Sequence, residues 1–247
     1  MDWQAIWLTA RLAFLVTVIL LALGTPLAHW LAFSTRRWRG LVEAVVALPL
    51  VLPPTVLGFY LLLAMGPAGP LGRLTEALGL GLLPFTFPGL VVASVVYSLP
   101  FAVQPLAVAF AAVDRSLIET SWTLGRSPLQ TFLRVTAPLS AGGFLTAAVL
   151  AFAHTIGEFG VVLMVGGNIP GVSRTISIAI YDRVQALDYD SAAALALPLL
   201  VVSFAVLAVT YTIRGRAGGT GGRDRRSGDG AGSAPRPAPA QRWPDAS

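Results

Sequence analysis

The residue with the clearest chemical potential in this sequence is a glutamate inside a long apolar stretch. Glu158 lies within Ala141–Val165, and an ionisable group in the middle of a membrane-spanning segment costs at least about 2.5 kcal/mol unless it is paired or hydrated. His154 lies four residues earlier, on the same helical face and within reach of a pair. Since a carboxylate does not attract an oxyanion, we expect Glu158 to act at a gate or pathway rather than as an anion ligand. A helix–helix hydrogen bond that holds packing is the alternative.

Glycine and proline accompany this glutamate and recur in a second apolar stretch, Leu41–Met65. The glycines that flank Glu158 would let helices approach closely, and packing alone would account for them. The two consecutive prolines of the second stretch remove helical hydrogen bonds, and the freed carbonyl groups must meet other helices, water or a cavity. We therefore predict a pathway or gate formed by Pro53, Pro54, Thr55, His154, Gly157, Glu158 and Gly160.

No catalytic or metal-binding motif accompanies these residues. The sequence has no cysteine and only two histidines, which excludes thiolate sites and leaves no usual metal site. It has no lysine, so the phosphate-binding loop of ATPases, which requires one, cannot form. We predict that this chain is not an enzyme and holds no metal or cofactor. We predict no nucleic-acid partner either, because basic and aromatic residues do not interleave.

A polar, arginine-bearing segment, Asp114–Ser140, separates two apolar stretches. Its first part has the pattern of a short amphipathic helix. Gly125 would end that helix, and Ser127-Pro128 would begin a second one. Two short helices at the membrane surface would form a docking element for a cytoplasmic partner. An ordinary amphipathic loop with chance spacing is the alternative.

The spacing within this segment resembles the signature of ABC importer permeases. That signature is Glu-Ala-Ala, three residues, glycine, nine residues and Ile-x-Leu-Pro. This sequence keeps the glutamate, glycine and proline at that spacing but not the two alanines, the isoleucine or the leucine. In the family such segments form coupling helices that contact the ATPase subunit. The resemblance therefore implies an ATPase-coupling role for Glu119, Thr120, Ser121, Gly125, Arg126 and Pro138.

Two further stretches, Leu48–Gly66 and Ala151–Tyr181, resemble the molybdate-type permeases, which are relatives of the sulfate and tungstate permeases. The specific matches are Leu-Pro-Pro, Gly-Glu-Phe-Gly and Asn-Ile-Pro-Gly, and the likeness covers about residues 1–213. It implies import of molybdate by alternating access, with tungstate or sulfate as the alternative cargo. The implied partners are a second copy of the chain, cytoplasmic ABC ATPase subunits, an extracytoplasmic substrate-binding protein and the oxyanion itself.

Composition places the elements that carry these residues in a membrane. Of the 247 residues, 55% are hydrophobic and 12% are charged, whereas soluble domains are about a quarter charged. Five stretches reach the length of about 20 residues that a spanning helix needs. We therefore predict an all-α polytopic membrane protein with five transmembrane helices and short cytoplasmic coupling helices. The five stretches are Ile6–Phe33, Leu41–Met65, Phe87–Val113, Ala141–Val165 and Ala192–Ile213.

Arginines set the predicted orientation. They cluster after the first, third and fifth stretches, and such clusters mark cytoplasmic loops. The N-terminus then lies outside and the C-terminus in the cytoplasm, in a bacterial cytoplasmic (inner) membrane. A sixth span could come only from Leu74–Phe87, which Glu76 and several glycines disfavour. On the outer side, Arg174 and Arg183 would attract a dianion or contact a binding protein, or else belong to a solvated mixed-charge loop.

The chain is expected to divide into two parts. Residues 1–214 would form the permease domain, with the coupling segment at 114–140, and residues 215–247 would form a disordered cytoplasmic tail, because their Gly- and Pro-rich composition cannot build a core. Two other function classes remain open. A secondary transporter would need internal hydropathy repeats and paired intramembrane charges, and a membrane-embedded enzyme would need clustered His, Asp or Glu within the spans. The sequence has neither the repeats nor such a cluster.

Overall fold

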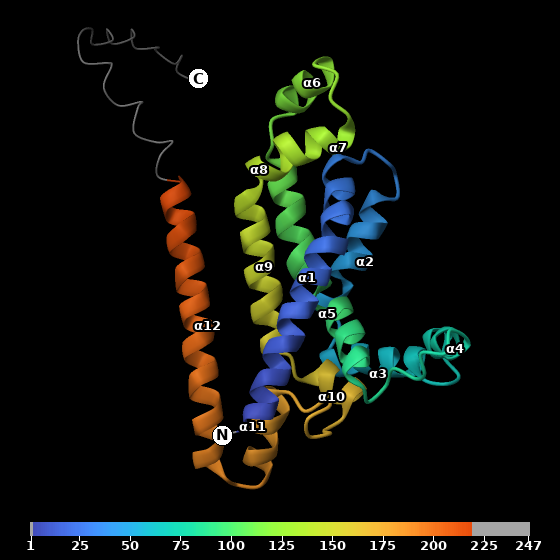
Figure 1. Ribbon diagram of the computed structural model, residues 1–247, viewed down its shortest axis with the longest axis vertical. Helices are drawn as coiled ribbons and strands as arrows, with labels where there is room; N and C mark the ends of the chain where they lie inside the picture. Colours follow the sequence, from blue (N-terminus) through green and yellow to red (C-terminus); the bar gives the residue numbers. More distant parts are fainter. Residues whose placement is uncertain (1, 219–247) are drawn as a thin grey trace, which may run out of the picture. The chain divides into compact units, whose positions relative to one another are not determined.

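The structure, a computed structural model, describes residues 2–218, and all its regular elements in that range are helical (Figure 1). This confirms the all-α fold class. Residues 1–211 form one compact unit, and most of the predicted tail at 215–247 lies outside the described residues. The elements are α1 (Trp3–Phe33), α2 (Arg39–Val51), α3 (Pro54–Met65), α4 (Pro70–Ala77), α5 (Phe87–Ala111), α6 (Arg115–Thr123), α7 (Pro128–Thr131), the π-helical turn η1 (Phe132–Thr136), α8 (Ala137–Leu139), α9 (Ala141–Ile156), α10 (Gly160–Gly166), α11 (Ile176–Gln185) and α12 (Tyr189–Gly218).

Helices α1, α5 and α9 run side by side and form the centre of the compact unit (Figure 1). Lipid is as apolar as the helices, so close contact depends on small residues rather than on exclusion of water. Ala102 of α5 and Ala151 of α9 are fully buried in this core. Gly143 of α9 faces Ala109 of α5 so closely that an added Cβ would overlap with the alanine side chain.

Several of the helical segments are long and apolar enough to cross a membrane. Three meet the criterion alone, Trp3–Phe33, Pro54–Ala77 and Phe87–Ala111. A fourth arises if Pro128–Leu139 and Ala141–Ile156, which are bent by 74° relative to each other, count as one span. The predicted first and third spans therefore correspond to α1 and α5, whereas the second and fourth differ from the continuous helices that hydropathy suggests.

The predicted second span is divided into α2 and α3. Leu52 and Pro53 have extended backbones, with ψ of 136° and 134°, because each precedes a proline and a following proline disfavours the helical conformation. Single prolines do not have this effect here: Pro26 lies inside the continuous helix α1, and Pro100 lies inside α5. The break therefore comes from two prolines in succession, which force two consecutive residues out of the helix.

The predicted fourth span, Ala141–Val165, is also interrupted. Helix α9 ends at Ile156 and α10 begins at Gly160. Phe159, with φ −129° and ψ −62°, is not helical. Glycine is the weakest helix former after proline, so the glycines on both sides of Glu158 weaken the helix there. The glutamate expected within a continuous spanning helix lies in a helix break instead.

The two ends of the compact unit carry different elements. Helices α6, α7 and α8 gather at one end with the connection between α1 and α2, while α3, α10, α11 and the start of α1 lie toward the other (Figure 1). The segments that carry the arginines of the first two predicted cytoplasmic loops therefore lie at one end. These arginines are Arg36, Arg37, Arg39, Arg115, Arg126 and Arg134.

Candidate functional site: a groove between two helix breaks

The two helix breaks lie against each other. A Cβ added to Gly160, the first residue of α10, would be 2.8 Å from Cβ of Pro54, the first residue of α3. One turn farther along α3, a Cβ on Gly58 would be 2.8 Å from Cβ of Met164. At both positions, the absence of a glycine side chain therefore lets the backbone of one helix pack directly against a side chain of the other. The predicted close approach is found at Gly160 but not at Gly157, where an added Cβ would meet nothing nearer than 3.7 Å.

Glu158 is buried within this junction. Its side chain is 4% exposed, and Ser94 Oγ of α5 donates a hydrogen bond of 2.6 Å to its Oε2. The second carboxyl oxygen, Oε1, is buried and has no hydrogen-bond partner. Within residues 2–218, no arginine or histidine nitrogen forms an ion pair with this carboxyl group. Burial of a polar atom without a partner is costly, so the single bond from Ser94 leaves the carboxyl group incompletely satisfied.

His154 binds a different serine and does not form the expected pair with Glu158. Ser98 Oγ lies 2.9 Å from His154 Nδ1 and 3.1 Å from Thr155 Oγ1. The imidazole stacks on Phe101, with ring centroids 3.9 Å apart. The four-residue spacing produces contact only within a continuous helix, and α9 ends before Glu158. Two serines one turn apart on α5 therefore hold the two ionisable groups separately.

An open groove brings the predicted pathway residues together. It has a volume of about 530 Å³, and six of its lining residues belong to the predicted set of seven, with only Pro53 absent. Sequence reasoning missed Tyr97, which also lines the groove, and the two buried serines of α5. The signal that could have found them is the regular placement of Ser94, Tyr97 and Ser98 in an apolar helix, three and four residues apart. The predicted members that line the groove are Pro54, Thr55, His154, Gly157, Glu158 and Gly160.

The segment 114–140 contains the predicted pair of short helices, α6 and α7. Gly125 between them has φ +75°, with no atom near an added Cβ, so a left-handed turn is the reason for glycine there. Ser121 is buried, and its Oγ lies 2.9 Å from Thr131 Oγ1, which joins α6 to α7. Glu119 and Thr120 are exposed. Ser121 therefore joins the two helices, while Glu119 and Thr120 remain exposed and can contact a partner.

Local hydrogen bonds fix the ends of these short helices. Asp114 Oδ1 accepts a bond of 2.9 Å from the Ser116 N–H, which lowers the pKa of Asp114. Ser127 and Gln130 form a reciprocal capping box at the start of α7. Arg126 and Pro138 are exposed. Each of these contacts spans two or three residues, so the local sequence determines the shape of this segment.

A second cavity, of about 380 Å³, lies where α6 meets the end of α1. Glu119 and Trp122 of α6 line it together with His29 and Phe33 of α1 and Phe132 of η1. The His29 ring contacts Phe33 and Phe132, with centroids 4.9 and 5.4 Å apart. The exposed glutamate of the signature therefore lies beside a cavity whose far wall belongs to the long helix α1.

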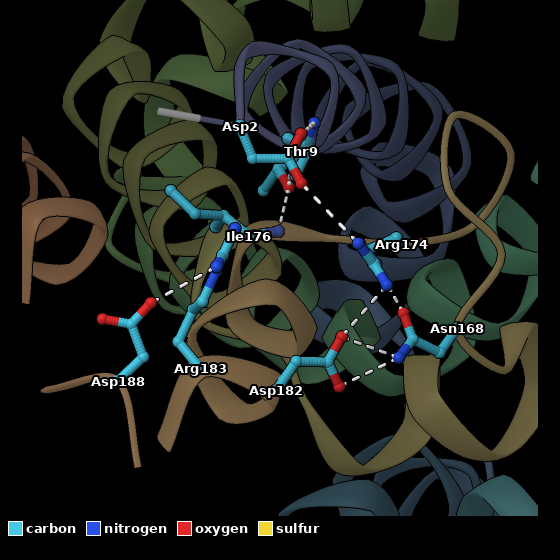
Figure 2. Close-up of polar contacts among 9 residues, drawn as sticks. Asp2, Thr9, Asn168, Arg174, Ile176, Asp182, Arg183 and Asp188 are labelled. Carbon is cyan, nitrogen blue, oxygen red and sulfur yellow. Dashed lines mark hydrogen bonds and ion pairs between the residues drawn. The ribbon is translucent and has the colours of Figure 1, made fainter. Parts of the chain in front are cut away.

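Two arginines toward the opposite end of the compact unit, Arg174 and Arg183, are paired with acidic side chains (Figure 2). Arg174 lies 3.2 Å from Asp182 and 3.9 Å from Asp2, and its Nε donates a 2.6 Å bond to Asn168 Oδ1. Arg183 lies 3.3 Å from Asp188. Both arginines therefore have carboxylate partners within the chain, which favours the mixed-charge alternative over free cations that attract a dianion.

A family model and the sequences of known proteins match nearly the same part of the chain. Residues 6–217 match the family model described as "Binding-protein-dependent transport system inner membrane component". The chain is 58% identical over 213 residues to the molybdenum transport system permease protein ModB of Azotobacter vinelandii, which covers 86% of this chain and 94% of that protein. The ModB of Escherichia coli K12 is 36% identical over 213 residues, covering 86% and 91%.

Solved structures resemble the fold at low sequence identity. A bacterial ABC transporter involved in import of the acidic polysaccharide alginate matches with a TM-score of 0.70 at 19% identity, covering 86% of this chain and 78% of that one. The MetNI methionine ABC transporter, in inward-facing conformations, matches with a TM-score of 0.65 at 16% identity, covering 86% and 94%. At such identities the likeness concerns the fold alone.

Proposed function

This chain belongs to the family of binding-protein-dependent transport system inner membrane components, and on that premise we propose that it translocates molybdate into the cytoplasm. It is a transport permease of an ABC importer rather than an enzyme. The observation that supports molybdate is the 58% identity to the molybdenum permease of Azotobacter vinelandii over 94% of that protein. Tungstate and sulfate are the competing cargoes, and direct competition decides among them.

We propose that the working assembly contains two copies of this chain, cytoplasmic ABC ATPase subunits and an extracytoplasmic binding protein. The groove is not enclosed within one chain, and a second copy related by a two-fold axis would complete a closed pathway. The arginine clusters support an orientation with the N-terminus outside and α6 and α7 in the cytoplasm. The ATPase subunits would then meet α6 and α7, and the binding protein would meet the opposite end.

The coupling residues have distinct roles in this proposal. Glu119 and Thr120, both exposed on α6, and Arg126 after the turn contact the ATPase subunit. Ser121 holds α6 against α7 through Thr131, and Gly125 makes the turn between them. Pro138 lies in the short helix α8, which leads toward α9. A rigid helix pair of this kind would transmit ATPase movement into α9 and so to the helix break at Glu158.

The groove is the proposed path of the oxyanion. Broken helices that meet within the membrane are where transporters commonly bind their substrates, because the ends of helices offer unpaired backbone groups. Helix α3 begins at Pro54 beside the groove, so the positive end of its dipole faces the place where an anion would pass. Alternating access would open the groove to each side in turn.

The test is uptake of labelled molybdate by proteoliposomes that contain this chain with its ATPase and binding protein. We expect ATP-dependent uptake that tungstate inhibits more strongly than sulfate. Glu119→Ala should reduce uptake at least tenfold, while Glu76→Ala, an exposed glutamate on α4, should not. Uptake without ATP would contradict the ABC mechanism, and coupled ATP hydrolysis without molybdate uptake would contradict the cargo.

A further inference from the structure

The carboxyl group of Glu158 has an unusual pattern of partners for an ionised side chain. A carboxylate accepts hydrogen bonds at both oxygens, but here Oε2 accepts one bond from Ser94 and the buried Oε1 accepts none. A buried ion needs a counter-ion and further hydrogen bonds to offset its lost hydration. The carboxyl group has one hydroxyl donor and no cationic partner within residues 2–218.

The titratable groups on the surrounding helices do not supply the missing charge, because their side chains have other contacts. On α9, His154 contacts Ser98, and on α5, Tyr97 contacts the His154 ring. Helix α10 has no titratable residue. The remaining groups and their contacts are Arg11 of α1 with the Phe87 ring, His29 of α1 with Phe33 and Phe132, Tyr60 of α3 with Phe59, Tyr181 of α11 with Phe159, and Asp182 and Arg183 of α11 with Arg174 and Asp188.

We infer that Glu158 is a neutral carboxylic acid in this conformation, and that its O–H group donates a hydrogen bond to the oxyanion when alternating access opens the groove around it. Because Oε2 accepts from Ser94, the proton resides on Oε1, the oxygen that has no other partner. This inference rests on the proposed transport of an oxyanion through the groove. It gives Glu158 the role of an anion-positioning donor, whereas an ionised carboxylate would repel the same anion.

The composition of the groove fits weak binding by neutral donors. Within residues 2–218, its lining contains no arginine, and the hydroxyl-bearing residues Thr55 and Tyr97 share it with Glu158. Hydrogen bonds from neutral donors are roughly half as strong as those from charged donors. An oxyanion would therefore be oriented in the groove but not trapped there, as passage through a transporter requires. Loss of the Glu158 proton would place a negative charge in the groove and oppose passage.

The experiment measures ATP-driven molybdate uptake by the wild type, Glu158→Gln and Glu158→Leu over a range of about pH 6 to 9. Glutamine is a neutral donor of the same shape, whereas leucine donates nothing. The ratio of wild-type to Gln-variant uptake at each pH cancels the pH dependence of the ATPase and the binding protein. We expect this ratio to fall severalfold as pH rises, and we expect uptake by the Leu variant to be at least tenfold lower than uptake by the Gln variant at every pH.

Three outcomes would overturn the inference: a ratio that does not change with pH, a ratio that rises with pH, or a Gln variant as inactive as the Leu variant. Infrared spectroscopy of the purified chain in lipid gives a test that does not depend on uptake. A protonated carboxylic acid band near neutral pH should be present in the wild type and absent from Glu158→Gln. If the wild type takes up no molybdate, the proposed function fails, while the infrared band still decides whether Glu158 holds a proton.

Discussion

The groove and the coupling segment 114–140 are built in opposite ways. In the groove, Glu158 meets Ser94 across 64 residues of sequence, and His154 meets Ser98 across 56. In the coupling segment, the bonds at Asp114 and at Ser127 connect residues only two or three positions apart. The first region depends on the packing of whole helices, and the second is formed largely by its own residues.

Because the two regions are built differently, we expect variants in them to affect protein stability and ATPase coupling differently. A change in the groove disturbs contacts between α3, α5, α9 and α10, so we expect it to alter folding and transport together. A change on the exposed face of α6 removes no buried contact, so we expect it to alter coupling alone. The variants below test that separation, beginning with the largest expected effect on stability.

Gly160→Ala should have the largest effect on stability. Its Cβ would lie 2.8 Å from Pro54 Cβ, and overpacking of this kind costs about 1–3 kcal/mol. Gly157→Ala is the matched control, because its Cβ would meet nothing nearer than 3.7 Å. Thermal unfolding in detergent should show a lower melting temperature for Gly160→Ala only. Equal melting temperatures would mean that α3 and α10 do not pack as closely as the structure indicates.

Ser121→Ala should have the next largest effect, because it removes a buried contact between α6 and α7. It leaves the buried Thr131 hydroxyl without its 2.9 Å partner, at a cost of about 1 kcal/mol. Adding Thr131→Val should recover most of that loss, since neither hydroxyl would then lack a partner. Thr120→Ala, at an exposed position whose hydroxyl bonds within its own helix, is the control. If the double variant were no more stable than Ser121→Ala, the hydroxyl pair would not join the two helices.

Arg174→Gln should lower stability more than Arg183→Gln. Among the described residues, Arg174 contacts Asp2, Asp182 and Asn168, whereas Arg183 has Asp188 as its one carboxylate partner. Exposed ion pairs contribute about 0–1 kcal/mol each. We therefore expect the loss of unfolding free energy to lie near the upper end of that range for Arg174→Gln and near the lower end for Arg183→Gln. Neither variant should raise the KM for molybdate uptake, because both arginines are already paired. A raised KM in Arg174→Gln with unchanged melting would identify Arg174 as an anion attractor.

Asp114→Ala should give the smallest effect, a local loosening of the first turn of α6. The hydrogen bonds from Ser116 lower the pKa of Asp114. A lowered pKa means that the cap stabilises the helix above the ordinary pKa of aspartate and loses this effect as pH falls through the lowered value. Amide hydrogen exchange should therefore be faster in α6 of Asp114→Ala at neutral pH and unchanged in Asp114→Asn, because asparagine also caps helices. Faster exchange outside α6 would show that the segment is less local than the structure indicates.

The sequence predicted the coupling segment more completely than the groove for the same physical reason. Gly125 and Ser127-Pro128 are local signals, and they placed the end of one helix and the start of the next. Hydropathy predicted α1 and α5 equally well, because length and apolar composition are enough to identify such helices.

The helix breaks and the partners of Glu158 required the structure. Hydropathy treats Ala141–Val165 as one apolar stretch, and the helix ends within it where two glycines coincide with a glutamate that binds Ser94 on another helix. Six of the seven predicted pathway residues still line one groove, because proline, glycine and an intramembrane carboxylate are each unfavourable in a plain spanning helix. Their meeting point depended on tertiary packing, which no local pattern encodes.

The most direct test of the groove as the translocation pathway uses the absence of native cysteine. Thr55→Cys places one thiol in the groove, and Phe14→Cys places one on the outer surface of α1, where the native side chain is 67% exposed. In active complexes, a water-soluble, membrane-impermeant thiol reagent should modify Thr55→Cys and block molybdate uptake, and it should leave Phe14→Cys unmodified within lipid. Modification of Thr55→Cys without loss of uptake, or no modification during ATP-driven turnover, would contradict the account.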